Sequence, residues 1–222
     1  QFGYHFTRWL PEKVLGLISQ KGGYHDTTFS DVAFEIPMLF FIGENDLQYR
    51  IDNLSYIFFS HRQFGAKWSL LVEKNVAHDQ INDNQFLNTY FNEVVEERLS
   101  PDNDFYQFVS LNNLIDSVSW LGHNNLLNID SWDCFVNNKD SSSWLISRNI
   151  ANYWRKFNLQ EPLLIEYNLD FNQDCQTDIN DVLFLSDILL KKRVNNLFVD
   201  YNQDYIFNIF DFYNFIEKIY LD

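Results

Sequence analysis

The sequence IPMLFFIGEND at residues 36–46 decides the fold of the first part of the chain. Residues 36–42 carry no charge and Gly43 ends the apolar run, a pattern typical of a strand buried on both faces. Two more short apolar runs, at residues 14–19 and 68–72, have the same character. Strands of this kind predict a parallel sheet that helices cover on both sides.

Helical patterns separate these strands. Residues 51–63 and 83–98 each predict a helix, and the second begins with an acidic first turn at Asp83. The alternation of strand and helix predicts an α/β fold. Residues 2–9 also have helical spacing and lack the pattern of a signal peptide, so we expect further sequence before Gln1.

The chain is acidic and rich in aromatic residues. Its 222 residues carry a formal net charge of −15; 46% are hydrophobic and 18% aromatic. This charge argues against nucleic acid and anionic membrane surfaces as partners, and no apolar run approaches the ~18 residues of a membrane span. Two cysteines without a CxxC motif do not make a disulfide framework, and the sequence leaves open whether Cys134 and Cys175 pair.

Two polar residues follow neighbouring strands where a parallel sheet places its sites. Asp46 comes after the strand at 36–42, and His78 comes after the strand at 68–72. Because the carboxyl ends of parallel strands meet at one edge, we expect the two side chains to meet. Alternatively, Asp46 caps a helix or turn and His78 is a surface residue. His25, after two glycines, is a weaker candidate base at the same edge.

Residues 1–100 resemble the C-terminal half of an α/β-hydrolase, in particular secreted esterases similar to polyhydroxybutyrate depolymerases and feruloyl esterases. The resemblance rests on a strand followed by G-x-x-D ending at Asp46, then a helix, a strand and a loop with His78. It implies that Asp46 is the acid and His78 the base of a catalytic triad, in the family's order. Pro11-Glu12-Lys13-Val14 also matches a junction of the family, and the resemblance extends more weakly to 143–157.

The nucleophile of such a triad is absent from the chain. No G-x-S-x-G motif occurs in the 222 residues, and the resemblance places the serine just upstream of Gln1. A triad needs a serine to attack, an imidazole to take its proton and a carboxylate to hold the imidazole tautomer. We therefore expect this chain to be inactive when it is alone.

Residues 101–160 complete the esterase-like part, and residues 161–167 connect it to a second module. We expect an edge strand or hairpin at 124–135 and a helix at 148–157 with Ser147 as its N-cap. The predicted domains are an α/β-hydrolase part at 1–160, a linker at 161–167 that contains Pro162, and a small all-α module at 168–222.

The last part of the chain contains an internal repeat. The sequences DFNQDCQTDIND from Asp170 and DYNQDYIFNIFD from Asp200 are 30 residues apart, and each has oxygen-bearing side chains at positions 1, 3, 5, 9 and 12. That is the ligand spacing of a twelve-residue calcium loop. Each loop leads into an apolar helical pattern. The predicted ligands of two Ca²⁺ ions are Asp170, Asn172, Asp174, Asp178 and Asp181, then Asp200, Asn202, Asp204, Asn208 and Asp211.

Residues 168–222 resemble a type I dockerin, the EF-hand-like module by which secreted enzymes dock onto the cohesin domains of a cellulosome scaffold. The resemblance rests on Asp at position 12 of both loops and on the lack of a helix before each loop. Position 6, normally glycine because the backbone there often has positive φ, is Cys175 and Tyr205. Positions 10 and 11 are Ile179-Asn180 and Ile209-Phe210 instead of the usual hydroxyl pair, so cohesin specificity is open.

Together these patterns predict a secreted, extracellular serine esterase that acts on a carboxylic ester, with acyl groups on plant polysaccharides as the expected substrate class, and that docks to a cohesin through calcium. The alternative is a non-catalytic, calcium-dependent docking or scaffold protein with a hydrolase-like fold. A lipase or peptidase of the same fold is a third possibility. The identity of the residue at the expected nucleophile position, upstream of Gln1, distinguishes the esterase from the scaffold protein: a serine supports the esterase, and another residue supports the scaffold.

Overall fold

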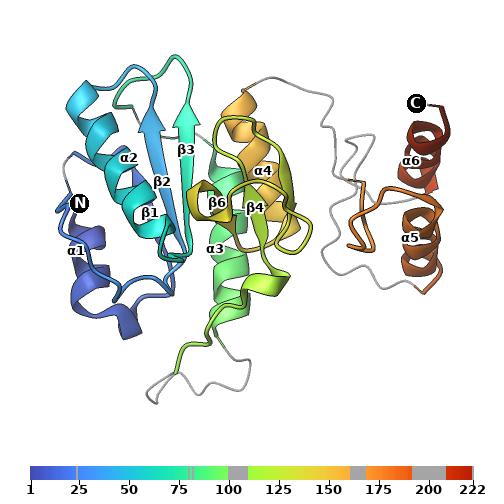
Figure 1. The fold of residues 1–222 in the computed structure, drawn as a ribbon, viewed down its shortest axis with the longest axis horizontal. Coiled ribbons are helices and arrows are strands. Elements are labelled where there is room, and N and C mark those ends of the chain that lie inside the picture. The colour runs from blue at the N-terminus through green and yellow to red at the C-terminus, as the bar shows by residue number, and fades with distance from the viewer. Residues whose placement is uncertain are drawn as a thin grey trace. The chain divides into compact units, whose positions relative to one another are not determined.

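A computed structural model describes residues 1–23, 25–79, 81, 83–99, 110–160, 169–191 and 209–221. The chain divides into two compact units, Gln1–Ile165 and Glu166–Asp222, and each is described by itself. The described residues have a mixed α/β composition, with a three-stranded parallel sheet and six α-helices (Figure 1). The predicted linker at 161–167 lies outside the described residues.

The parallel sheet of the first unit has the strand order β1-β2-β3. Its strands are β1 (Leu17–Gln20), β2 (Met38–Gly43) and β3 (Trp68–Glu73). Met38 pairs with Leu17 on one side and with Trp68 on the other, so β2 is the central strand. All six residues of β2 are buried, as the uncharged run predicts. The parallel sheet predicted from the sequence is therefore present.

Helices cover both faces of this sheet, as expected for strands without polar alternation. On one face, Phe40 of β2 packs in a cluster with Tyr4 of α1 (Phe2–Trp9) and Leu54 of α2 (Gln48–Arg62). On the other face, Phe41 packs with residues of α3 (Asn84–Arg98) and α4 (Arg148–Leu159). Figure 1 shows α2 on one side of the strands and α3 and α4 on the other.

A small antiparallel sheet has the strand order β5-β4-β6. It packs in the same hydrophobic cluster as α3 and α4, on the second face of the parallel sheet. Its strands are β4 (Trp120–Gly122), β5 (Ile129–Ser131) and β6 (Ser143–Leu145). The edge strand expected within 124–135 is β5, whereas β4 and β6 are strands that the sequence did not indicate. Trp154 of α4 joins this layer to the parallel sheet, because its Nε1 donates to the Leu70 carbonyl at 2.7 Å.

The ends of several elements differ from the sequence prediction. The first strand begins at Leu17, not at Val14, because Pro11–Lys13 form the short 3-10 helix η1 and delay it. Helix α2 begins at Gln48, earlier than the expected residue 51. Ser147 is the predicted N-cap of α4 and accepts from the Ile150 N–H. Asp83, expected in the first turn of its helix, is instead the N-cap of α3 and accepts from the Phe86 N–H. Two further 3-10 helices, η2 (Asp116–Val118) and η3 (Lys139–Ser141), lie in the connections.

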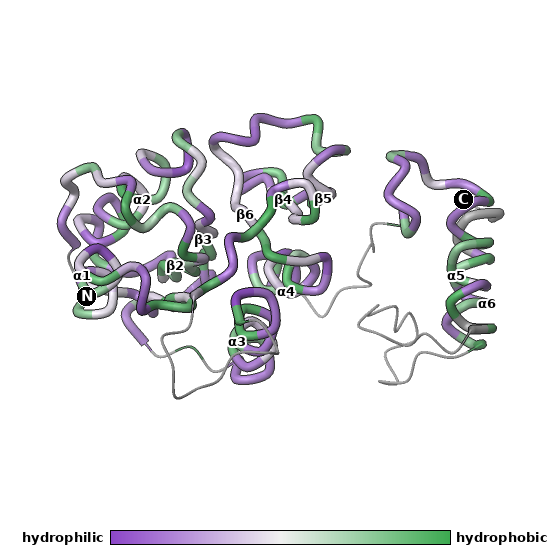
Figure 2. Tube along the Cα trace, turned by 90° about the horizontal axis from the view of Figure 1, so that it is seen from below, coloured by the Kyte–Doolittle hydropathy of each residue, from purple (hydrophilic) through white to green (hydrophobic). Residues whose placement is uncertain are grey.

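The second unit contains α5 (Ile179–Lys191) and α6 (Ile209–Leu221). Its buried cluster consists of Phe171, Val182, Leu185 and Phe215, which come from the loop and both helices. Both helices predicted to follow the repeated loops are present, and Figure 2 shows their many hydrophobic residues. Among the described residues, no helix is long and apolar enough to cross a membrane.

A buried arginine fastens α2 to the loop before β6. Arg62 donates from Nε to the Ser142 carbonyl and from Nη2 to the Lys139 carbonyl, each at 2.6 Å. A third bond, from Nη1 to the Ala66 carbonyl, is also 2.6 Å long. Burial lowers the pKa of Arg62 to about 10, so the side chain is charged near neutral pH. One side chain therefore satisfies three backbone carbonyls.

We predict that Arg62→Met destabilises the first unit by roughly 3 kcal/mol or more, because each buried carbonyl left without a donor costs about 1–3 kcal/mol. Urea unfolding followed by tryptophan fluorescence measures this, since all six tryptophans lie in the first unit. Lys74→Met, at an exposed position, is the control and should change stability little. Equal midpoints for the two variants would contradict this account of Arg62.

Candidate functional site

The loops after β2 and β3 bring Asp46 and His78 together. His78 Nδ1 lies 2.8 Å from Asp46 Oδ2, within hydrogen-bond distance. The contact that the sequence predicted between these two side chains is therefore present. Because a carboxylate can only accept, the hydrogen bond places the imidazole proton on Nδ1 and leaves Nε2 as the acceptor of the neutral ring.

Gly43 allows the two loops to approach each other. A Cβ atom on Gly43 would lie 2.0 Å from the Ala77 carbonyl oxygen and 2.6 Å from that of Val76. The Val76 carbonyl also accepts a hydrogen bond of 2.9 Å from the Asn45 N–H. The loop that carries His78 therefore rests directly on the end of β2, where only a residue without a side chain fits.

Asp46 is held by three donors and is almost fully covered. Its side chain is only 5% exposed and receives hydrogen bonds from the Leu47 N–H at 2.7 Å and from Arg50 Nη1 at 3.1 Å, in addition to His78. Burial acts to raise the pKa of Asp46, but these hydrogen bonds outweigh it and hold the pKa below its ordinary value. The carboxylate therefore stays ionised at the pH at which a histidine base works.

His78 has the opposite exposure, because 46% of its side chain is accessible. Among the described residues, Asp46 is the one side chain hydrogen bonded to it, and no serine hydroxyl is bonded to Nε2. Nε2 can therefore accept a proton from a group that this part of the chain does not supply. The arrangement fits an oriented general base with its acid.

The weaker candidate base, His25, is a core residue. Its ring is fully buried against Tyr4 and Phe40. Its backbone N–H and carbonyl are both bonded to the Asn53 side chain, and Nε2 lies 3.3 Å from Ser19 Oγ. Burial lowers the pKa of His25 to about 4. A fully buried ring cannot reach a substrate, so its contacts are those of a structural histidine.

The first predicted calcium loop folds around its own carboxylates. Buried Asp181 accepts from the N–H groups of Phe171, Asn172 and Asp178 at 2.6, 3.1 and 2.9 Å. Asp170 accepts from the N–H groups of Asp174 and Cys175 at 3.1 and 3.0 Å. Positions 1 and 12 of the loop therefore turn inward and close it.

Cys175 adopts the backbone conformation expected at position 6. Its φ is +68°, the left-handed region in which glycine usually occurs, and Gln173 at position 4 has φ +60°. A non-glycine residue in this region carries strain of about 1 kcal/mol or more, which the surrounding hydrogen bonds offset. The missing glycine therefore does not prevent the loop from forming.

The donor atoms of this loop fit a hard cation. The side chains at positions 1, 3, 5, 9 and 12 supply carboxylate and amide oxygens, the ligands that Ca²⁺ takes in proteins. Burial and the nearby charges of Asp181 and Asp174 raise the pKa of Asp170, despite the hydrogen bonds from the Cys175 and Asp174 N–H groups. A cation would relieve this repulsion and favour the ionised form.

Most of the second predicted loop lies outside the described residues, namely Asp200, Asn202, Asp204 and Asn208. Its position 12, Asp211, is described and is fully buried in the first turn of α6. Asp211 thus has the same burial and helical position as Asp181, 30 residues earlier.

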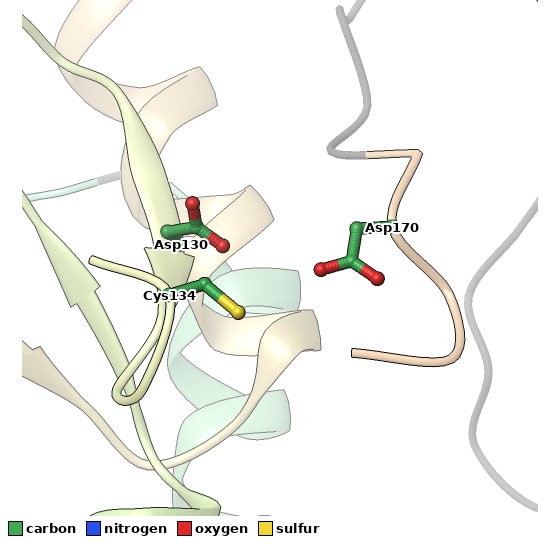
Figure 3. A group of neighbouring side chains, drawn as sticks. All are labelled: Asp130, Cys134 and Asp170. Carbon is green, nitrogen blue, oxygen red and sulfur yellow. The ribbon is translucent and has the colours of Figure 1, made fainter. Parts of the chain in front are cut away.

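Figure 3 draws Asp130 of β5, Cys134 just after it and Asp170 of the first calcium loop, a set of oxygen and sulfur side chains. Both cysteines are disulfide-bonded, so Cys134 offers no thiolate to a metal ion. Asp170 is already part of the loop described above. We therefore do not assign a metal site to this group.

Comparisons of the chain with protein-family models, with curated proteins and with solved structures found no match.

Sequence reasoning missed one residue of the site. Arg50 holds the carboxylate of Asp46 from the first turn of α2. The spacing of four residues between an acidic and a basic residue at a helix start is a signal that could have indicated it. For Gly43 the sequence predicts the end of a strand and the first position of the G-x-x-D motif, but not its close contact with the loop that carries His78.

We predict that Gly43→Ala displaces the His78 loop and breaks the hydrogen bond to Asp46, because the added methyl group overlaps the Ala77 carbonyl. Overpacking of this kind costs roughly 1–3 kcal/mol of stability. A crystal structure of the variant measures the displacement directly. Gly23→Ala is the matched control, since its Cβ would meet no atom within 4 Å. An unmoved loop in Gly43→Ala would contradict the prediction.

Proposed function

We propose that this chain is the C-terminal part of a secreted serine esterase of the α/β-hydrolase class, followed by a calcium-binding dockerin module. The observation that carries the first half is the hydrogen bond between His78 and Asp46 at the carboxyl ends of adjacent parallel strands. The acid precedes the base in the chain, as in that class. The repeated loops support the second half.

In the proposed reaction, a serine upstream of Gln1 attacks the carbonyl carbon of an ester and gives its proton to His78 Nε2. The imidazolium then protonates the leaving alcohol as the ester bond breaks, which leaves an acyl-enzyme. Water, deprotonated by the same nitrogen, releases the acid and restores the serine. Asp46 stays ionised throughout and stabilises the imidazolium. The proposed substrates, feruloyl or acetyl esters of plant polysaccharide, rest on the resemblance to the esterase family.

The alternative, a docking or scaffold protein with a hydrolase-like fold, also has an observation in its favour. In the described residues no serine hydroxyl is bonded to His78, and the sequence contains no G-x-S-x-G. The exposed imidazole would then have no catalytic use. The oriented Nδ1 hydrogen bond and the almost fully covered Asp46 favour the esterase, because a surface histidine needs neither.

The second unit is proposed to bind two Ca²⁺ ions through the ten residues of its two loops and to dock onto a cohesin domain. The inward-turned Asp170 and Asp181 support the first site. Ile179 and Leu183 of α5 are exposed, as are their counterparts 30 residues later, Ile209 and Tyr213. Apolar side chains exposed at equivalent positions of both repeats are what a protein-binding face requires.

Secretion is proposed together with this function. Both cysteines are disulfide-bonded, which is the state expected in an oxidising extracellular compartment. Extracellular calcium would also keep weak sites of this loop type filled.

We predict that the full chain binds two Ca²⁺ ions in calorimetry and that Asp181→Asn removes one of them, because position 12 closes the first loop. At free calcium near ten times Kd, mass action adds about 1.4 kcal/mol of stability per site. Affinity should fall at acidic pH as the raised pKa of Asp170 is approached. Asp187→Asn, an exposed position of α5, is the control. If calorimetry shows no calcium binding, the dockerin proposal is wrong.

We predict that the 222-residue chain does not hydrolyse p-nitrophenyl acetate or methyl ferulate, whereas a chain extended upstream to include the nucleophile does. Loss of a triad member typically lowers kcat on the order of 10⁴–10⁶-fold. In the extended chain, His78→Ala should abolish turnover and His123→Ala should not. Turnover by the 222-residue chain that depends on His78 would mean that the nucleophile lies within these residues.

A further inference from the structure

Lys21 is a buried lysine in an unusual backbone conformation at the end of β1. It is 2% exposed and has φ +44°, in the left-handed region. Its N–H donates to the Phe41 carbonyl at 3.0 Å, which continues the pairing of β1 with β2. A buried ammonium is costly unless it is paired, so its partners show what this lysine holds.

The ammonium has two partners on the chain segment that contains His78. Nζ lies 2.5 Å from Glu73 Oε2, at the last residue of β3. Nζ also donates to the backbone carbonyl of Asp79 at 2.8 Å. Asp79 is the residue after His78. One buried charge therefore connects the end of β1 to both ends of the loop that presents the imidazole.

This connection matters because His78 has little packing of its own. Its half-exposed side chain is bonded to Asp46, so its orientation depends on the backbone around it. Before His78, the loop rests on Gly43 and is bonded to the Asn45 N–H. After His78, the bond from Lys21 is the one hydrogen bond to Asp79 that the described residues contain.

We propose that Lys21 is a positioning residue for His78: its ammonium fixes the Asp79 carbonyl and so aims the imidazole Nδ1 at Asp46. The inference rests on the role of base proposed above for His78, and it adds a residue from a third strand to that site. Lys21 itself is buried and acts through the loop, not on the substrate.

The test measures the tautomer of His78 in the full chain, without any need for turnover. Long-range ¹H–¹⁵N spectra of the protein labelled at its five histidines report which ring nitrogen carries the proton, and His78→Gln assigns the signal. The spectra are recorded at about pH 8.5, so that the two neutral tautomers are compared. The wild-type chain should show the Nδ1–H tautomer of His78.

Lys21→Met should lower the ratio of Nδ1–H to Nε2–H tautomer of His78 by roughly tenfold, the size expected when a hydrogen bond to a charged group is lost. Tryptophan fluorescence should show that the first unit remains folded. His123, which is hydrogen bonded to the N–H groups of Asn125 and Leu126, is the internal reference and should not change.

A second pair of variants separates positioning from the effect of an unpaired carboxylate. Glu73→Gln keeps Lys21 and its bond to Asp79, so it should keep the Nδ1–H tautomer. Lys21→Met combined with Glu73→Gln should lose that tautomer, although no carboxylate is left unpaired. If the double variant keeps the tautomer, or Glu73→Gln alone loses it, the positioning role is overturned.

The tautomer measured in the wild type and in Lys21→Met separates the role of Lys21 from the proposed function of His78. An unchanged tautomer in Lys21→Met, with the Nδ1–H form present in the wild type, overturns the role of Lys21 alone. A wild-type chain without the Nδ1–H form overturns the pairing of His78 with Asp46, and the role of Lys21 with it.

Discussion

The candidate site depends on the close contact of two backbone segments at Gly43. The loop after β3 rests on this residue, and a single methyl group there would overlap the Ala77 carbonyl. The contact sets the distance between the loops that carry Asp46 and His78, and the hydrogen bond of 2.8 Å between them follows from it. Burial of β2 on both faces fixes Gly43 in turn, because the two residues before it, Phe41 and Ile42, are held in different core clusters.

Charge has different consequences in the two units. In the first unit, buried cations such as Arg62 and Lys21 hold backbone carbonyls and thereby connect elements that are far apart in the sequence. In the described part of the second unit, the carboxylates of Asp181 and Asp170 turn inward and accept from backbone N–H groups. The buried cations of the first unit are part of the chain itself, whereas the divalent ion proposed for the second unit would add stability only when it binds.

The central strands and the meeting of Asp46 with His78 were predictable because both follow from short local patterns. An uncharged apolar run specifies a buried strand, and parallel strands bring the residues after them to one edge. The inward Asp181 and the positive φ of Cys175 follow in the same way from the spacing of the loop. The catalytic role of His78 and the binding of calcium stay predictions.

Other features could not be predicted, since they depend on contacts between distant segments. Strands β4 and β6 are each three residues long and are defined by their pairing with each other across more than twenty residues of sequence, which a local pattern does not indicate. A lysine at the end of a strand is usually solvated, and only the positions of Glu73 and Asp79 make Lys21 a buried partner. His25 belongs to the core because Tyr4 and Phe40 pack against it, which its glycine-rich surroundings do not indicate.

The most direct test of the central claim is covalent labelling of the extended chain with a fluorophosphonate, followed by mass spectrometry of the labelled peptide. The activated serine forms the phosphorus–oxygen bond, fluoride leaves, and the proton passes to His78. The account predicts one adduct, on a serine upstream of Gln1, that is lost in His78→Ala. Labelling that is absent, that is unchanged in His78→Ala, or that falls on a serine within the 222 residues would contradict it.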